Sequence, residues 1–131
     1  MNVIEWTEAM KRGIAFQDAD HKQQVALMNA MQTCSDDEMP AAFAKHFAHI
    51  REHLGRENDL MERTDFYAKD VHMGVHESVL AELDAMQAKL DAGDIAAVRV
   101  YVCEDLPLWF LSHLETMDTM TAEFALQQGE S

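Results

Sequence analysis

The sequence predicts an all-α protein: an up-down-up-down antiparallel four-helix bundle with an N-terminal arm. Apolar residues recur with the helical period in four successive segments, and only short breaks separate these segments. The chain of 131 residues contains five Gly and two Pro. That is too few for an all-β protein, which needs a turn about every 8–12 residues. We expect one domain over residues 1–131, because a chain of this length supports a single core.

The first two helices are predicted over residues 18–34 and 40–63. The apolar face of the first carries His21, Val25, Met28 and Met31. The inner face of the second carries Phe43, Phe47, Ile50, His53, Leu54, Glu57, Leu60 and Met61. The intervening stretch SDDEMP breaks the helical pattern, and we expect Asp36 or Asp37 to cap the second helix.

The third and fourth helices are predicted over residues 69–91 and 94–127. The inner face of the third carries His72, Val75, His76, Val79, Leu83, Met86 and Leu90. Between the two helices, Gly93 is a C-terminal signal and Asp94 an N-cap. The inner face of the fourth carries Ile95, Val98, Val102, Leu106, Trp109, Phe110, His113, Met117, Met120 and Phe124.

Two parts of the chain depart from regular helix. Pro107 lies inside the fourth helix and has no N–H for the carbonyl of Cys103, so we expect a kink or a local break there. Residues 1–17 are too short to form a domain and are expected to lie along the bundle as an arm. Three apolar side chains should attach this arm: Ile4, Trp6 and Ile14.

Composition excludes several classes of partner. The formal net charge of −14 repels nucleic-acid phosphates and anionic lipid. No apolar run approaches the roughly 18 residues of a transmembrane helix, and MNVIEWTEAMKRG lacks the basic start and apolar core of a signal peptide. We expect a cytoplasmic monomer with no membrane insertion. Cys34 and Cys103 form no CxxC motif and are expected to be free thiols packed as small apolar side chains.

Five of the seven histidines fall on the predicted inner faces and are spread over all four helices. They are His21, His53, His72, His76 and His113. A buried imidazole needs hydrogen-bond partners, because an unpaired buried polar group costs about 1–3 kcal/mol. A core of leucines and methionines cannot supply so many partners, whereas a metal ion can.

The spacing of these residues is typical of metal chelation. His72 and His76 are four residues apart, so both rings leave one face of a helix and can bind the same ion. His53 and Glu57 repeat this spacing with a carboxylate, and His21 adds one ligand from the first helix. HxxxH alone is a weak motif, but HxxxE, HxxxH and HxxxxD on three successive helices make a strong constellation.

The last of these motifs, His113 to Asp118, has a looser spacing. Five steps of about 100° place Asp118 about 140° around an α-helix from His113. We expect a long inner face and a favourable rotamer to bring both side chains to one centre. Five imidazoles and two carboxylates exceed the needs of one ion and suit two ions bridged by the carboxylates. The spacing alone leaves Fe, Mn, Zn and Cu open.

Four motifs together resemble the hemerythrin family. They are DADHK (18–22), HLGRENDLM (53–61), HMGVH (72–76) and WFLSHLETMD (109–118), in this order and at these intervals. The segment EWTEAMKRGIAF is similar to the N-terminal arm of that family, so the resemblance covers nearly the whole chain. The length and single-domain form look most like a bacterial hemerythrin.

The resemblance implies a non-haem di-iron centre that binds O2 reversibly, for storage, transport or delivery to an O2-consuming enzyme, and no enzymatic activity. It implies that one iron is coordinatively full and is held by His72, His76 and His113. The other iron would keep an open position for O2 and would be held by His21 and His53. The resemblance also implies an oxo or hydroxo bridge and two bridging carboxylates, Glu57 and Asp118.

Several residues depart from the family pattern without removing a ligand. Asp20 stands where Gln is usual before the first ligand, and Leu54 where Phe usually follows the second. His49 stands where Tyr is frequent, and Asn58 where a second acid is common; the third helix also lacks a proline that is common at its start. We expect a dry O2 pocket formed by Leu54, Trp109, Phe110 and Leu114.

Other classes of di-iron or metal protein compete with this interpretation. Ferritin-like and oxygenase-type proteins use Glu-x-x-His motifs, and no histidine in this chain follows a glutamate at that spacing. Two carboxylates with five neutral imidazoles leave a more positive centre than four carboxylates do. We expect this to favour reversible O2 binding over O–O cleavage. A di-iron oxidase, an O2 or redox sensor, an iron-handling protein and a structural iron or zinc site remain as alternatives.

Overall fold

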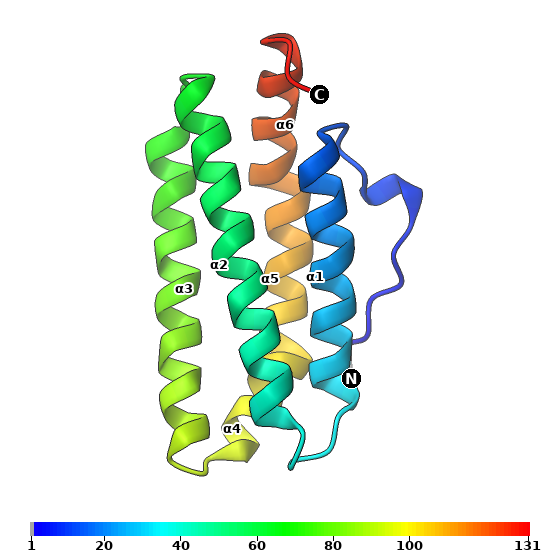
Figure 1. Ribbon diagram of the computed structural model, residues 1–131, viewed down its shortest axis with the longest axis vertical. Helices are drawn as coiled ribbons and strands as arrows, with labels where there is room; N and C mark the ends of the chain where they lie inside the picture. The colour runs from blue at the N-terminus through cyan, green and yellow to red at the C-terminus, as the bar shows by residue number, and fades with distance from the viewer. Residues whose placement is uncertain (1) are drawn as a thin grey trace.

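The protein is a four-helix bundle, as predicted, in a computed structural model that describes residues 2–131 (Figure 1). Three rods are single helices: α1 (Ala15–Thr33), α2 (Met39–Arg63) and α3 (Lys69–Asp91). The fourth rod runs through α4 (Ile95–Val100), η2 (Tyr101–Asp105), α5 (Leu106–His113), η3 (Leu114–Asp118) and α6 (Thr119–Gln127). The segments η2 and η3 are π-helical turns. The arm contains one short 3₁₀ turn, η1 (Glu8–Met10).

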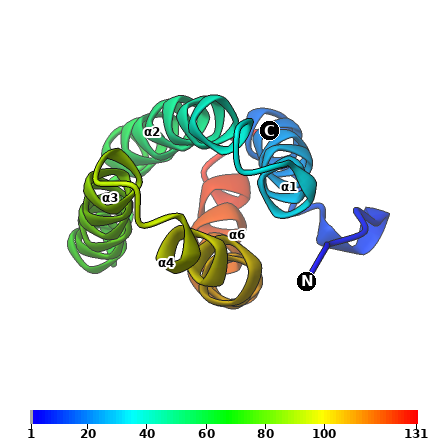
Figure 2. The same cartoon turned by 90° about the horizontal axis from the view of Figure 1, so that it is seen from below.

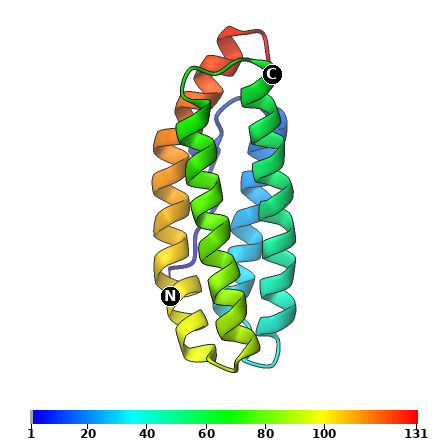
Figure 3. The ribbon, with the colours of Figure 1, turned by 90° about the vertical axis from the view of Figure 1, so that its left-hand side faces the viewer.

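Helices that follow one another in the chain lie side by side around a common interior. The view along the bundle shows α1, α2, α3 and the fourth rod surrounding one core (Figure 2). The side view shows α2 and α3 running in opposite directions and joined at one end of the bundle (Figure 3). Within residues 2–131, no helix is both long and apolar enough to cross a membrane.

The interior is layered along the bundle axis. A large apolar cluster fills the end near the α1–α2 and α3–α4 connections and includes Met28, Phe43 and Leu83. A smaller apolar cluster fills the opposite end and consists of Ile14, Leu60, Ala122 and Ala125. The buried His21, Glu57 and Asp118 lie between the two clusters in the sequences of α1, α2 and the fourth rod. Apolar packing above and below thus keeps this polar layer away from solvent.

Two helix starts differ from the sequence expectation. Helix α1 begins at Ala15 instead of residue 18, because Asp18 lies in its first turn and accepts the backbone N–H groups of Arg12 and Gly13 at 2.7 and 3.1 Å. The expected cap of α2 by Asp36 or Asp37 is wrong, since its N-cap is Glu38.

Other interactions organise the start of α2 instead. Ser35 and Glu38 exchange side-chain-to-backbone hydrogen bonds of 2.9 and 3.3 Å, the reciprocal pattern of a capping box. Asp36 is engaged elsewhere, because it accepts hydrogen bonds from Arg99 of α4 at 2.8 and 3.2 Å.

The α3–α4 connection follows the prediction. Gly93 has φ of 83°, a conformation that favours glycine, and its N–H bonds to the carbonyl of Leu90 at 3.1 Å. The N–H of Asp94 bonds to the carbonyl of Lys89 at 2.9 Å, which completes a Schellman motif. The Asp94 side chain then caps α4 by accepting the N–H of Ala97 at 3.2 Å.

The local break near Pro107 takes the form of a π-helical turn. Pro107 lies in the first turn of α5, directly after η2. The carbonyl of Cys103, which Pro107 cannot satisfy, accepts a 2.7 Å hydrogen bond from Nδ2 of Asn2. The N-terminal arm therefore compensates for the missing backbone donor of the fourth rod.

The arm is attached much as predicted. Ile4 and Ile14 are buried, and the half-buried Trp6 packs against the large core cluster. The side-chain amide of Asn29 on α1 bonds to both the N–H and the carbonyl of Ile4, at 2.9 and 2.8 Å. Both cysteines are free thiols, as expected, and both are half-buried.

Candidate metal centre

The structure brings all seven residues singled out from the sequence together at the middle of the bundle. One group of potential ligand atoms that lie within 4.8 Å of one another comprises Glu57, His72, His76, His113 and Asp118. A second such group comprises His21, His53 and Glu57. All seven side chains are buried. Every rod of the bundle contributes, so the centre exists only when the four helices pack together.

All five histidines turn Nε2 toward the two carboxylates. Two of these imidazoles, His21 and His53, are called the pair. Nε2 of His21 lies 3.0 Å from Oδ2 of Asp118 and 3.7 Å from Oε2 of Glu57. Nε2 of His53 lies 3.4 Å from the same Oε2. The pair therefore faces one oxygen of each carboxylate.

The remaining three imidazoles, His72, His76 and His113, form the trio. Nε2 of His76 lies 3.3 Å from Oε1 of Glu57. The Nε2 atoms of His72 and His113 lie 3.2 and 3.1 Å from Oδ1 of Asp118. The trio thus faces the other oxygen of each carboxylate. Two carboxylates that each turn one oxygen to the pair and one to the trio are arranged to bridge two ions.

A π-helical turn brings Asp118 into this arrangement. The α-helical projection placed Asp118 about 140° from His113, and we expected rotamers to correct this. Instead η3, which follows His113 and ends at Asp118, has the i→i+5 hydrogen-bonding pattern of a π-helix, which places residues five positions apart on one side. Thr119 completes the turn, because its hydroxyl donates to the carbonyl of Leu114 at 2.8 Å.

The outward-facing Nδ1 atoms of three ligands have side-chain partners. Nδ1 of His53 lies 2.9 Å from Oδ2 of Asp20. Nδ1 of His76 lies 2.8 Å from Oδ1 of Asn58, and Nδ1 of His72 lies 2.7 Å from Oγ1 of Thr121. Carboxylate and amide oxygens only accept hydrogen bonds, so Nδ1 of His53 and Nδ1 of His76 carry a proton, and Nε2 is the atom that each neutral ring would offer to a metal ion.

A further glutamine supports one of the carboxylates. Nε2 of Gln17 donates a 2.7 Å hydrogen bond to Oε2 of Glu57, and Gln17 is fully buried. Sequence reasoning missed this residue, and it treated Asp20 and Asn58 only as departures from the family pattern. The available signal was position, since Gln17 lies one helical turn before His21, and Asn58 directly follows Glu57.

Electrostatics keeps both carboxylates anionic. Burial acts to raise the pKa of Glu57, but the charge of His53 and imidazole hydrogen bonds hold it well below its ordinary value. Asp118 is affected in the same way. Burial and the charge of Glu57 act to raise its pKa, but hydrogen bonds from His113, His21 and His72 outweigh them, so the pKa of Asp118 lies below its ordinary value. For His53, burial lowers the pKa, but Glu57 and Asp20 outweigh burial and raise it to about 10.

The residues present fit a pair of metal ions. Within the described part of the chain, four buried atoms of the centre lie close to an opposite donor or acceptor but make no hydrogen bond of regular geometry: Nε2 of His21, Nε2 of His76, Oε1 of Glu57 and Oδ1 of Asp118. Unpaired buried donors and acceptors are costly, and buried anions require cations nearby. Ions bound between the carboxylates and imidazoles would satisfy these atoms.

The expected pocket residues divide into two sets. Leu54, Phe110 and Leu114 are buried in the large apolar cluster, and the Phe110 ring lies edge-on to His21 with centroids 5.8 Å apart. Trp109 is half-buried instead and stacks on His113 at 4.6 Å, on the side of the trio. Phe110 therefore lies beside the pair, whereas Trp109 shields one ligand of the trio.

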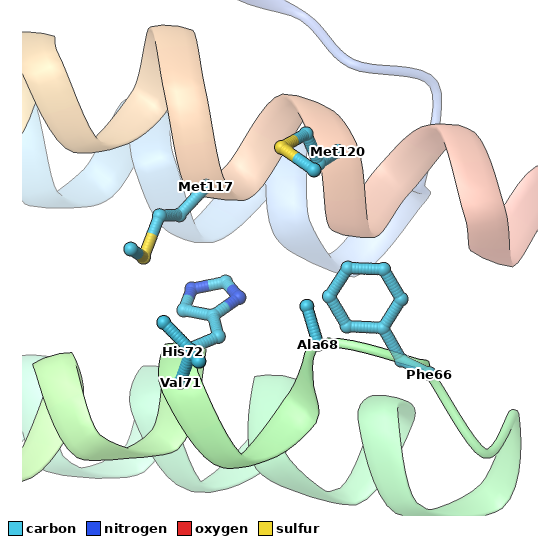
Figure 4. A pocket seen from close by; sticks show the side chains of 6 residues that line it. All are labelled: Phe66, Ala68, Val71, His72, Met117 and Met120. Carbon is cyan, nitrogen blue, oxygen red and sulfur yellow. The ribbon is translucent and has the colours of Figure 1, made fainter.

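An apolar pocket of about 140 Å³ approaches the trio from the surface, with the His72 ring at its floor (Figure 4). Its lining comes from the α2–α3 connection, the start of α3 and the second half of the fourth rod: Phe66, Ala68, Val71, His72, Met117 and Met120. This pocket therefore reaches the centre on the side opposite to the one expected to stay open.

A four-helix bundle that gathers five imidazoles and two carboxylates in its core has the architecture of a non-haem di-iron protein. No model of a known protein family matches the chain. The chain is 36% identical to a bacteriohemerythrin of Ralstonia nicotianae over 129 residues, which cover 98% of this chain and 93% of that protein. It is 25% identical to a myohemerythrin of Sipunculus nudus over 114 residues, 86% of each chain. The protein belongs to the hemerythrin family, whose members bind two non-haem iron ions.

Proposed function

We propose that the protein binds O2 reversibly at a di-iron centre and stores it, transports it or delivers it to an O2-consuming enzyme. The observation that carries this proposal is the division of the carboxylate oxygens between the pair and the trio, which fits two ions bridged by Glu57 and Asp118. When bound in the ferrous state, the two irons supply the electrons for reversible O2 binding.

The numbers of imidazoles give the two iron positions different roles. The trio and one oxygen of each carboxylate would hold one ion. The pair supplies one imidazole fewer, so the position at His21 and His53 keeps room for O2. Phe110 lies edge-on to His21, and Leu54 and Leu114 are buried in the same apolar cluster, so we expect the three side chains to exclude water from this side. Exclusion of water protects bound O2 from proton-driven loss and favours release as O2.

An O2-binding role is favoured over an oxidase role by the ligands themselves. A centre with five imidazoles and two carboxylates carries more positive charge than a four-carboxylate centre and supports highly oxidised iron less well. Redox sensing, iron handling and a structural iron or zinc site are the other candidates. The acidic surface, with a net charge of −14, would suit a basic partner, such as the enzyme that receives the O2.

Metal content and a visible spectrum test the proposal. We expect two irons per chain and an absorption band that appears when reduced protein meets O2 and disappears under vacuum. One zinc per chain and a colourless protein would contradict it. Prompt conversion to the diferric state with oxidation of an added substrate would favour a di-iron oxidase instead.

A further inference from the structure

The acceptors behind the ligand histidines differ in charge between the two iron positions. Within the described chain, three of the ligand histidines have a side-chain acceptor at Nδ1, and the chemical group of this acceptor differs among the three. His72 has the hydroxyl of Thr121, His76 has the amide oxygen of Asn58, and His53 has the carboxylate of Asp20. The charged acceptor thus lies behind the pair, whereas both neutral acceptors lie behind the trio.

Asp20 is itself held by an arginine. Nε of Arg56 donates to Oδ2 of Asp20 at 2.8 Å, and its terminal NH2 group donates to Oδ1 at 2.9 Å. The same Oδ2 accepts the 2.9 Å hydrogen bond from Nδ1 of His53. One carboxylate oxygen is therefore shared between a ligand histidine and a guanidinium group.

The backbone of Asp20 is fixed from the other side. Nε2 of His49 lies 2.9 Å from the carbonyl oxygen of Asp20 and donates to it. The His49 ring lies parallel to the His53 ring, with an interplanar angle of 3° and centroids 6.3 Å apart. The Asp20 side chain is 15% exposed and that of Arg56 is 42% exposed. This chain of contacts leads from the half-exposed Arg56 to the buried metal centre.

We propose that Asp20 is a positioning residue that strengthens His53 as an iron ligand, and that Arg56 limits this effect by sharing the carboxylate. The inference rests on the proposed assignment of His53 as a ligand. A carboxylate acceptor at Nδ1 fixes the tautomer and raises the basicity of the imidazole. A more basic ligand stabilises ferric iron more than ferrous iron, because ferric iron carries the larger charge. The pair position is thereby favoured in the oxidised state.

Two substitutions should shift the midpoint reduction potential of the iron-loaded protein in opposite directions. Asp20→Asn removes the charge behind His53, so the potential should rise. Iron bound at the pair should also dissociate roughly ten times faster, the lower end of the usual effect of losing such a partner. Arg56→Met keeps the carboxylate and removes its competitor, so the potential should fall. A tenfold change in the preference for ferric over ferrous iron corresponds to about 59 mV for one electron.

A matched control is available at the other end of the bundle. Arg99 also donates twice to an aspartate, Asp36, at 3.2 and 2.8 Å, but touches no ligand. Arg99→Met also removes hydrogen bonds to the carbonyls of Met31 and Cys34, so it should lower stability at least as much as Arg56→Met does, and it should leave the potential unchanged. The proposal is overturned if Asp20→Asn and Arg56→Met shift the potential in the same direction, or if either leaves it at the wild-type value.

The measurement separates this inference from the proposed function. The potential is determined by anaerobic redox titration of protein loaded with two irons, so O2 is never added. A protein that fails to bind O2 reversibly still shows the opposite shifts if Asp20 and Arg56 act on His53. A protein that binds O2 reversibly but shows no opposite shifts retains the function and loses the inference.

Discussion

His113 and Asp118 face the same point in the bundle although they are five positions apart, because η3, which follows His113 and ends at Asp118, is a π-helical turn. Nε2 of His113 lies 3.1 Å from Oδ1 of Asp118. A regular α-helix would direct the two side chains to different neighbours. The insertion of one π-turn therefore brings a second carboxylate to the centre without breaking the rod, consistent with the frequent occurrence of π-bulges at functional sites.

Thr119→Val should weaken this turn. The Thr119 hydroxyl donates to the carbonyl of Leu114 at 2.8 Å and accepts a 2.8 Å hydrogen bond from Nε of Arg12. Valine has the same shape but neither interaction, so the free energy of unfolding should fall by about 1–2 kcal/mol. Iron should also dissociate faster, because Asp118 is held less firmly. Chemical denaturation and timed iron release to a chelator measure the two effects.

Thr116→Val is the matched control for that substitution. The Thr116 hydroxyl donates to the carbonyl of Ser112 at 2.7 Å, but it lies on the exposed side of the same turn. We expect a change of less than about 0.5 kcal/mol in the free energy of unfolding, typical of surface substitutions. Equal effects of the two substitutions on iron release would show that the geometry of the turn does not depend on Thr119.

The sequence predicted the bundle and the seven side chains of the centre for one physical reason. His53 and Glu57 are polar residues at positions where helical periodicity requires apolar ones, and such conflicts mark functional sites. The route by which Asp118 reaches the centre was not predictable from that period, because a π-turn is a local departure from it. The roles of Gln17 and Asp20 depend on the register between α1 and α2, which periodicity within one helix does not encode.

Gln17→Leu should loosen iron with little effect on folding. Gln17 donates to Glu57 at 2.7 Å, but its own Oε1 is buried without a partner among the described residues. Leucine removes the hydrogen bond and the unpaired acceptor together, so the two contributions to stability roughly offset each other. Loss of a group that orients a ligand typically reduces metal affinity about 10–100-fold.

Gln24→Leu tests whether the effect of Gln17 is specific. Gln24 is buried on the same helix, and its Nε2 has no partner within residues 2–131. It makes no described hydrogen bond to a ligand, so iron release should match the wild type. Equal acceleration of iron release in both variants would assign the effect to repacking of α1.

His53→Ala should remove the iron at the pair and abolish O2 binding while the bundle stays folded. The pair would keep only His21 as an imidazole ligand, whereas the trio is unchanged. We expect about one iron per chain, no O2-dependent absorption band and an unchanged helical circular dichroism spectrum. Retention of the O2-dependent band would disprove the assignment of His53.

His46→Leu is the control for loss of a buried imidazole from the same helix. His46 lies two turns before His53, is fully buried, and has no hydrogen-bond partner in the described chain. It belongs to neither group of potential ligand atoms. The variant should therefore keep two irons and the O2-dependent band. Loss of iron in His46→Leu would show that any buried histidine of α2 affects the centre.

His46 should also make the stability of the fold sensitive to acid. Burial lowers the pKa of His46 from the ordinary 6.5 to about 3, so the unfolded chain binds a proton at this residue well before the folded chain does. The folded state is favoured by neutral His46 above pH 6.5, and this stability is lost progressively as the pH falls from 6.5 toward 3. Between pH 7 and pH 5 the loss should be about 2 kcal/mol, since each pH unit below the unfolded pKa costs about 1.4 kcal/mol.

Denaturation of the wild type and of His46→Leu at several pH values isolates this contribution. The carboxylates and the other histidines titrate in both proteins, so their effects cancel in the difference between the two free energies of unfolding. Leucine cannot take up a proton, so the variant should gain about 2 kcal/mol relative to the wild type between pH 7 and pH 5. A difference that stays constant over this range would mean that folded His46 accepts a proton as readily as the unfolded chain does, which contradicts its burial in an apolar core.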